Sequence, residues 1–288
     1  MTFNSNADVS GSGAQRRGPG GGAIAGGIGG LGAIAVILLQ IFTGGDFSSL
    51  LTGGGGMQAG EGTEITDCNT GADANASVDC RLVAGSKVIN SFWAGQVQNY
   101  RPPQLVIVDG STPTACGTAS NATGPFYCPP EETVYIDPTF FDVLEQQFGD
   151  QAGELAQLYV LAHEYGHHIQ QITGIFDRYP SNGTGPESNG VRTELQADCF
   201  AGGFIEDMSQ QTDANGVPYL QAPTEDQIRD ALDAAAAVGD DHIQSQSGRV
   251  NPESWTHGSS EQRQRWFATG FRYGVGSCDT FSVSGSDL

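Results

Sequence analysis

Hydrophobic and polar positions repeat with a helical period in several segments of the chain. The longest is Glu154 to Thr173, where apolar residues recur every three or four positions and a glycine follows the last turn. Val191 to about Met208 has the same pattern, as does Val83 to Tyr100, which two prolines terminate. Each of these segments is predicted to form a helix with one apolar face.

Capping signals locate two further helices, and short apolar runs locate two strands. Thr224 and Ser259 each precede a glutamine by three residues, the pattern of a capping box, so we expect a helix to begin after each. Residues 105–108 and 133–136 are β-branched and aromatic runs that predict strands, and 138–148 predicts a helix. The class predicted for this part of the chain is α+β, helix-dominated, with a small sheet.

The beginning of the chain has a different organisation. Residues 1–22 are polar and glycine-rich, which predicts a disordered tail. Residues 23–42 carry no charge and match the thickness of a bilayer, so we expect one transmembrane helix there. A cleaved signal peptide is the alternative for this run. A flexible Gly/Ser-rich linker is expected over 43–62, and one folded domain over 63–288.

The distribution of charged residues predicts on which side of a membrane these segments would lie. Arg16 and Arg17 precede the apolar run and only acidic residues follow it closely, so the positive-inside rule predicts a cytoplasmic N-terminus. The protein would then be a single-pass protein of the cell membrane with an extracytoplasmic domain. The formal net charge is −21, and Lys87 is the only lysine. Because so acidic a surface repels nucleic acid, we expect no nucleic acid as a partner.

Six cysteines agree with an extracytoplasmic domain, although free buried thiols are the alternative for some of them. We expect two local loops and one long-range link, pairing Cys68 with Cys80, Cys116 with Cys128, and Cys199 with Cys278. The middle pair would staple a loop over 110–130. The end of that loop, 126–128, is predicted to be extended and could present an edge strand to a peptide.

The strongest chemical signal is the sequence His163-Glu164-Tyr165-Gly166-His167 on the longest predicted helix. Histidines four residues apart share one helix face, so both imidazoles can bind one zinc ion. Glu164, one position along, can take a proton from the water that zinc activates and return it to a leaving amine. The alternative is a pair of histidines that face solvent or are satisfied in the core.

A catalytic zinc ion usually has three protein ligands, and no further histidine follows at a suitable spacing. Glu194 on the next long helix is therefore the predicted third ligand, with Glu187 and Glu206 as less well placed alternatives. Asp198, one turn after Glu194, could accept the second N–H of a liganding histidine. The alternative for Glu194 and Asp198 is a solvated acidic helix face.

Other polar residues are weaker candidates for catalysis. His257 lies in a loop before a helix and could stabilise an oxyanion, or simply bind the backbone. Arg263 and Tyr127 are weaker candidates for the same role. His168 points away from the zinc face of its helix and is interpreted as structural, and His242 as a surface residue.

Several stretches resemble the neutral zinc metallopeptidase family of bacterial membrane-anchored proteins. They are Ala115-Cys-Gly117, Gly124-Pro-Phe-Tyr-Cys-Pro129, Val134-Tyr-Ile-Asp137, Ala162-His-Glu-Tyr-Gly-His-His168, Glu194-Leu-Gln-Ala-Asp-Cys-Phe-Ala-Gly202, Gly239-Asp-Asp241, Thr256-His-Gly258 and Glu261-Gln-Arg263. The resemblance implies a single zincin-like metallopeptidase domain with glutamate as the third zinc ligand.

The main hypothesis is hydrolysis of peptide bonds in a peptide or protein substrate by a membrane-anchored zinc enzyme. A non-catalytic, zinc-stabilised module that binds cell-envelope proteins or peptides is the first alternative. Such a binding module would need the zinc ligands but would not need Glu164. A zinc hydrolase acting on another amide, such as an envelope peptide cross-link, is the second alternative.

Overall fold

The computed structural model describes residues 3–19, 62–148, 153–181, 183–246 and 248–288. Its strands are β1 (Gln15–Arg17), β2 (Thr63–Glu64), β3 (Gln104–Val108), β4 (Ser111–Thr114), β5 (Gly117–Ser120), β6 (Phe126–Cys128) and β7 (Thr133–Ile136). Its α-helices are α3 (Gly71–Ala76), α4 (Val78–Gln96), α5 (Thr139–Phe148), α6 (Glu154–Ile172), α7 (Ile175–Arg178), α8 (Asn189–Asp207), α9 (Glu225–Ala237), α10 (Asp240–Ser245) and α11 (Ser260–Tyr273).

Five strands form the main sheet, in the order β2-β1-β3-β7-β6. β1, β3 and β7 are parallel, whereas β2 and β6 run antiparallel to their neighbours. β4 and β5 form a separate hairpin within the predicted stapled loop. The predicted strands at 105–108 and 133–136 and the extended segment at 126–128 are confirmed, and β6 lies at the edge of the sheet.

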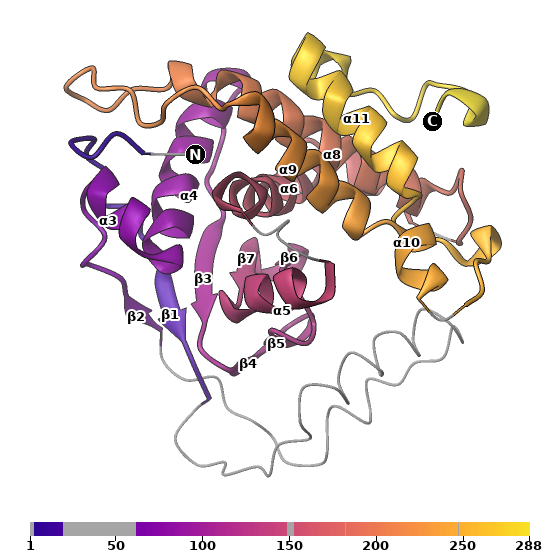
Figure 1. The fold of residues 1–288 in the computed structure, drawn as a ribbon, viewed down its shortest axis with the longest axis horizontal. Helices are drawn as coiled ribbons and strands as arrows, with labels where there is room; N and C mark the ends of the chain where they lie inside the picture. The colour runs from indigo at the N-terminus through magenta and orange to yellow at the C-terminus, as the bar shows by residue number, and fades with distance from the viewer. Residues whose placement is uncertain (1–2, 20–61, 149–152, 182, 247) are drawn as a thin grey trace.

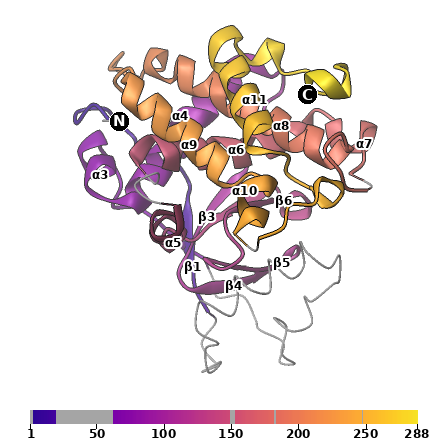
Figure 2. The same ribbon diagram turned by 45° about the vertical axis from the view of Figure 1, so that its right-hand side comes forward.

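The helices gather beside this sheet. In Figures 1 and 2, α6, α8, α9 and α11 lie together, and the β4–β5 hairpin lies towards the opposite end of the molecule. α6 contacts α4, α8, α9 and β6, so the predicted zinc helix lies between the sheet and the other long helices. One large hydrophobic core joins α4, β3, α6 and α8. The helix-dominated α+β class is therefore confirmed.

The disulfide pairing expected from the sequence is confirmed. The structure joins Cys68 to Cys80, Cys116 to Cys128, and Cys199 to Cys278. The third bond links α8 to the segment that follows α11, and Leu288 packs into a small core around this bond. The C-terminal segment is thereby held against the helix that carries the predicted third ligand.

Residues 3–19 belong to the folded domain, which corrects the prediction of a disordered tail over 1–22. Phe3, Val9 and Ala14 are buried in the main core. β1 pairs in parallel with β3 and antiparallel with β2. The composition was misleading because a short strand with polar side chains needs only backbone hydrogen bonds to join a sheet.

This sheet also bears on the predicted membrane topology. β1 precedes and β2 follows the segment 20–61, and the two strands are hydrogen-bonded neighbours. A single crossing of a bilayer between them would place them on opposite faces, where they could not pair. The described strands therefore disagree with a cytoplasmic N-terminus joined by one crossing to an extracytoplasmic domain.

The predicted transmembrane helix at 23–42 lies outside the described residues, as does nearly all of the predicted linker at 43–62. Within the described ranges, no helix has both the length and the apolar character needed to cross a membrane.

Candidate metal centre

Helix α6 presents two histidines from one face. His163 and His167 are one turn apart, so their side chains project in the same direction. α8 packs closely against α6 at Gly166, where an added Cβ would lie 3.1 Å from the Cα of Ala197. This close approach of the two helices brings Glu194 of α8 to the two imidazoles.

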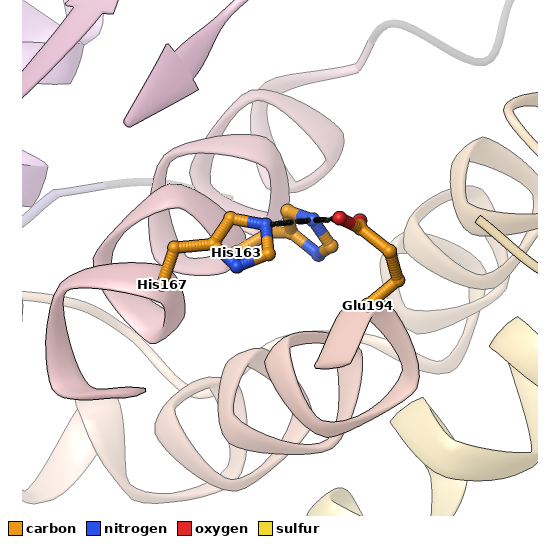
Figure 3. Close-up of side chains that lie close together, drawn as sticks. All are labelled: His163, His167 and Glu194. Carbon is orange, nitrogen blue, oxygen red and sulfur yellow. Dashed lines mark hydrogen bonds and ion pairs between the residues drawn. The ribbon is translucent and has the colours of Figure 1, made fainter. Parts of the chain in front are cut away.

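Figure 3 shows the side chains of His163, His167 and Glu194 directed at one another. The Nε2 atom of His163 is 3.2 Å from Nε2 of His167 and 3.1 Å from Oε2 of Glu194. The Nε2 atom of His167 is 3.5 Å from Oε1 of Glu194. The structure thus brings together the three residues predicted from the sequence as metal ligands.

The spacing of these atoms fits a tetrahedral zinc site. Metal–ligand bonds of 2.0–2.1 Å in a tetrahedral arrangement separate neighbouring ligand atoms by about 3.3 Å. The three observed separations are 3.1, 3.2 and 3.5 Å. Two imidazoles and a carboxylate are also a ligand set of catalytic zinc sites, in which a fourth position remains for water or substrate. Zinc therefore fits the residues present.

A buried carboxylate orients His163. Asp198 is fully buried, and its Oδ1 accepts hydrogen bonds from Nδ1 of His163 at 2.8 Å and from the hydroxyl of Tyr159 at 2.6 Å. Arg263 donates to both carboxylate oxygens, from Nε at 2.8 Å and from Nη2 at 2.9 Å. Because the carboxylate can only accept, His163 carries a proton on Nδ1 and directs Nε2 at the metal position.

The electrostatics of the site favour a cation. Burial opposes ionisation of Asp198, but the charges of Arg263 and His163 outweigh it and lower the pKa of Asp198. Burial also opposes protonation of His163 and His167, yet Asp198 and Glu194 raise the pKa of these imidazoles. A field that holds protons on buried imidazoles also favours a divalent cation between them.

Glu164 follows the first of these histidines on α6 and is 7% exposed. It lines a cavity of about 540 Å³, together with the three residues whose ligand atoms converge. Its carboxylate is not part of that converging set. Glu164 therefore lies beside the metal position, where its carboxylate can contact a molecule bound in the cavity.

His257 lines the same cavity from the loop before α11. Its Nδ1 is 3.3 Å from Oδ1 of Asp240, and the backbone N–H groups of Thr256, His257 and Gly258 donate to Oδ2 of Asp240. Burial opposes protonation of His257, but the hydrogen bond to Asp240 outweighs it and raises the pKa of His257. Asp240 thus fixes the loop and favours an imidazolium that can donate from Nε2 into the cavity.

Two weaker oxyanion candidates are engaged elsewhere. Arg263 is buried against Asp198, as described above. The buried His168 has its Nε2 2.7 Å from the backbone oxygen of Arg101, which can only accept, so its Nδ1 accepts from the hydroxyl of Tyr127 at 3.0 Å. Burial lowers the pKa of His168, which agrees with this neutral form. His168 is therefore structural and links α6 to the edge strand β6.

The remaining candidates lie away from the centre. Glu187 and Glu206, the alternatives to Glu194, are exposed and are not in the converging set. His242 is exposed on α10. The third-ligand position is thus taken by Glu194.

Four polar residues that support the site, directly or through another side chain, were not given these roles from the sequence. Tyr159 lies one turn before His163, so its place on the same face could have been recognised from spacing. Asp240, Gln170 and Gln196 are buried polar residues whose partners depend on tertiary contacts, and nothing in the local sequence indicates those partners.

The chain belongs to the family described as "Putative neutral zinc metallopeptidase", whose profile matches residues 4–281. The match begins within the N-terminal segment that the structure packs into the domain. It therefore covers every residue of the candidate centre.

Two relatives show how far this similarity extends. The chain is 48% identical over 226 residues to the uncharacterized protein Rv2575 of Mycobacterium tuberculosis, covering 77% of each chain. It is 40% identical over 269 residues to the uncharacterized protein YpfJ of Escherichia coli K12, covering 90% of this chain and 88% of that one. No solved structure matches the chain.

Proposed function

We propose that the protein is a zinc-dependent peptidase in which His163, His167 and Glu194 hold the metal. The observation that carries the proposal is the convergence of three ligand atoms in a cavity that Glu164 also lines. A purely structural zinc site is usually closed by four protein ligands, whereas this one has three beside an open cavity. Membership of the zinc metallopeptidase family supports the same reading.

When bound, zinc would acidify water and polarise a scissile carbonyl. Glu164 accepts the proton of the attacking water and passes it to the leaving amine, acting as general base and then general acid. Asp198 holds His163 in the tautomer that binds the metal. His257, whose protonated form is favoured by Asp240, is placed to donate to the oxyanion that forms on the substrate.

The edge strand β6 supports a peptide as the substrate. β6 pairs with β7 on one side and is the last strand in the sheet order. Phe126 and Tyr127 of β6 line the cavity that contains the metal ligands. An extended peptide can add to such an edge through backbone hydrogen bonds, which would align it along the cavity.

A chelation experiment tests the function with the full chain. The protein is assayed for bound zinc and for cleavage of a broad peptide library, before and after removal of metal. We expect cleavage to stop on chelation and to return with zinc. Glu164→Gln is expected to keep the zinc and lose about 10²–10⁴-fold of the activity. Glu206→Gln, an exposed glutamate on α8, is the matched control and should cleave like the wild type.

Other outcomes would favour the alternatives. Zinc binding without cleavage of any peptide would favour the zinc-stabilised binding module. Cleavage confined to a non-peptide amide would favour the second alternative. Cleavage by Glu164→Gln at the wild-type rate would contradict the proposed mechanism.

A further inference from the structure

His167 lacks the carboxylate partner that orients His163. Its Nδ1 lies 2.8 Å from Oε1 of Gln170, which is one turn further along α6 and fully buried. A metal-bound histidine commonly donates its second N–H to a carboxylate, a carbonyl or water. Here that acceptor is a side-chain amide, and the direction of its dipole decides which tautomer His167 can adopt.

A backbone carbonyl fixes that direction. Nε2 of Gln170 is 2.7 Å from the backbone oxygen of Thr193, which can only accept a hydrogen bond. The NH₂ group of Gln170 therefore faces α8, and Oε1 faces His167. Oε1 can only accept, so Nδ1 of His167 carries the proton and its Nε2 lone pair is directed at the metal position.

A second buried glutamine continues the chain of hydrogen bonds. Nε2 of Gln170 also donates to Oε1 of Gln196 on α8, at 3.1 Å. Nε2 of Gln196 in turn donates to the backbone oxygen of Cys278, at 2.8 Å. Cys278 is bonded to Cys199, which lies three residues after Gln196 on α8. The C-terminal segment thus contributes the last acceptor of a path that begins at a metal ligand.

We propose that Gln170 and Gln196 are positioning residues that form an amide relay between His167 and the C-terminal segment. The relay holds His167 in its metal-binding tautomer, and the Cys199–Cys278 disulfide holds the carbonyl at the far end of the relay. The zinc affinity of the protein therefore depends on residues of the C-terminal segment that do not touch the metal. This inference rests on the proposed zinc site but not on peptide hydrolysis.

Two substitutions at Gln170 separate positioning from packing. Gln170→Leu removes the acceptor, so zinc affinity, measured by competition with a chelator, should fall about 10–100-fold. Gln170→Glu keeps an acceptor for Nδ1–H of His167 but removes the donor to Thr193. It should lower the stability of the protein while leaving zinc affinity within a few-fold of the wild type. Gln171→Leu, the neighbour outside the relay, should bind zinc like the wild type.

The metal-free protein gives a second readout. Nitrogen-15 chemical shifts of the imidazoles, recorded at a pH above the raised pKa of His167 so that the ring is neutral, should show His167 protonated on Nδ1 in the wild type and in Gln170→Glu. In Gln170→Leu the neutral ring should populate both tautomers. A role limited to packing would leave the tautomer unchanged in all three proteins.

Coupling to the C-terminal segment is tested at the far end. Gln196→Leu keeps the disulfide and should weaken zinc binding by less than Gln170→Leu. Replacing both Cys199 and Cys278 by serine should weaken it by a similar amount, and the combined variant should lose little more, because both changes break one path.

The relay would be overturned if Gln170→Leu kept the zinc affinity and the His167 tautomer of the wild type. It would also be overturned if Gln170→Glu lost as much zinc affinity as Gln170→Leu. Fully additive effects of Gln196→Leu and the two serine substitutions would overturn the coupling to the disulfide. A wild-type protein that binds zinc but cleaves no peptide would contradict only the proposed function. A wild-type protein that binds no zinc would overturn the relay together with the site.

Discussion

Arg263 donates two hydrogen bonds to the two oxygens of Asp198, at 2.8 and 2.9 Å, and both side chains are buried. The arginine comes from α11 and the aspartate from α8, so this ion pair joins the two helices directly behind His163. It holds a charged carboxylate in the core, where that carboxylate can accept the N–H of the histidine. The pair therefore contributes both to the packing of the domain and to the geometry of the metal centre.

Asp198→Asn should lower both the stability of the domain and its affinity for zinc. It leaves the buried guanidinium of Arg263 without its counter-charge, which should lower the free energy of unfolding by about 3–5 kcal/mol. It also replaces the acceptor for Nδ1–H of His163 with an amide, which should reduce zinc affinity about 10–100-fold. Denaturant unfolding of the metal-free protein and chelator competition measure the two effects. Asp226→Asn, which breaks the exposed pair with Arg229, should change neither.

The contact between α8 and α11 depends on glycine. A Cβ added to Gly270 would lie 1.8 Å from the backbone oxygen of Cys199. Gly270→Ala should therefore force the helices apart and lower the free energy of unfolding by about 3 kcal/mol or more. Gly95, exposed near the end of α4, has nothing within 4 Å of such a Cβ. Gly95→Ala should stabilise the protein by about 0.5–1 kcal/mol, and the opposite order of the two melting temperatures would contradict this account of the packing.

The N-terminal segment should be required for stability. Phe3 is 1% exposed and packs in the main core, so Phe3→Ala should lower the free energy of unfolding by about 3–5 kcal/mol. Asn6→Ala, at an exposed position of the same segment, should have little effect. Chemical unfolding of the full chain measures both. If the two variants unfolded alike, residues 3–19 would not be part of the domain in solution.

Acid should destabilise the loop that carries His257. Burial opposes ionisation of Asp240, but its hydrogen bonds with His257 and the backbone lower the pKa of Asp240 below its usual value. A group whose pKa is lower in the folded state stabilises that state above its unfolded pKa, about 4. That contribution is lost as the pH falls through the lower, folded pKa. Between pH 5 and pH 2, wild-type stability should therefore decline more steeply than that of Asp240→Asn. Parallel profiles would show that Asp240 is not charged in the native loop.

The helices of the site could be predicted because their signals are local. Periodicity located α6 and α8 to within two residues of their observed bounds. Both capping boxes are formed, with Thr224 before α9 and Ser259 before α11. The capping box locates only the start of α11, which ends at Tyr273 and packs against α8.

Strand β1 could not be predicted in this way. Its sequence, Gln15-Arg16-Arg17, shows no alternation of apolar and polar residues, and the segment around it is rich in glycine. In the structure its side chains find partners far along the chain, with Arg16 paired to Asp79 and Arg17 donating to the hydroxyl of Tyr135. Such partners are specified by the assembled sheet and not by neighbouring residues.

The same distinction between local signals and long-range contacts holds for the residues of the candidate centre. His163 and His167 follow from the spacing of one helix turn, and Glu194 from the number of ligands that zinc requires. The partners that orient these ligands are long-range. Gln170 and Asp240 meet the acceptors and donors that define their roles only after α8 and the loop before α11 are in place.

The place of β1 in the sheet also sets the order in which the chain can fold. This strand is synthesised about 90 residues before its parallel partner β3, so it must wait before it can pair. A nascent chain that has completed α3 and α4 still lacks the centre of its sheet. β1 has to stay accessible until then, and any factor that binds it during synthesis would compete with assembly of the domain.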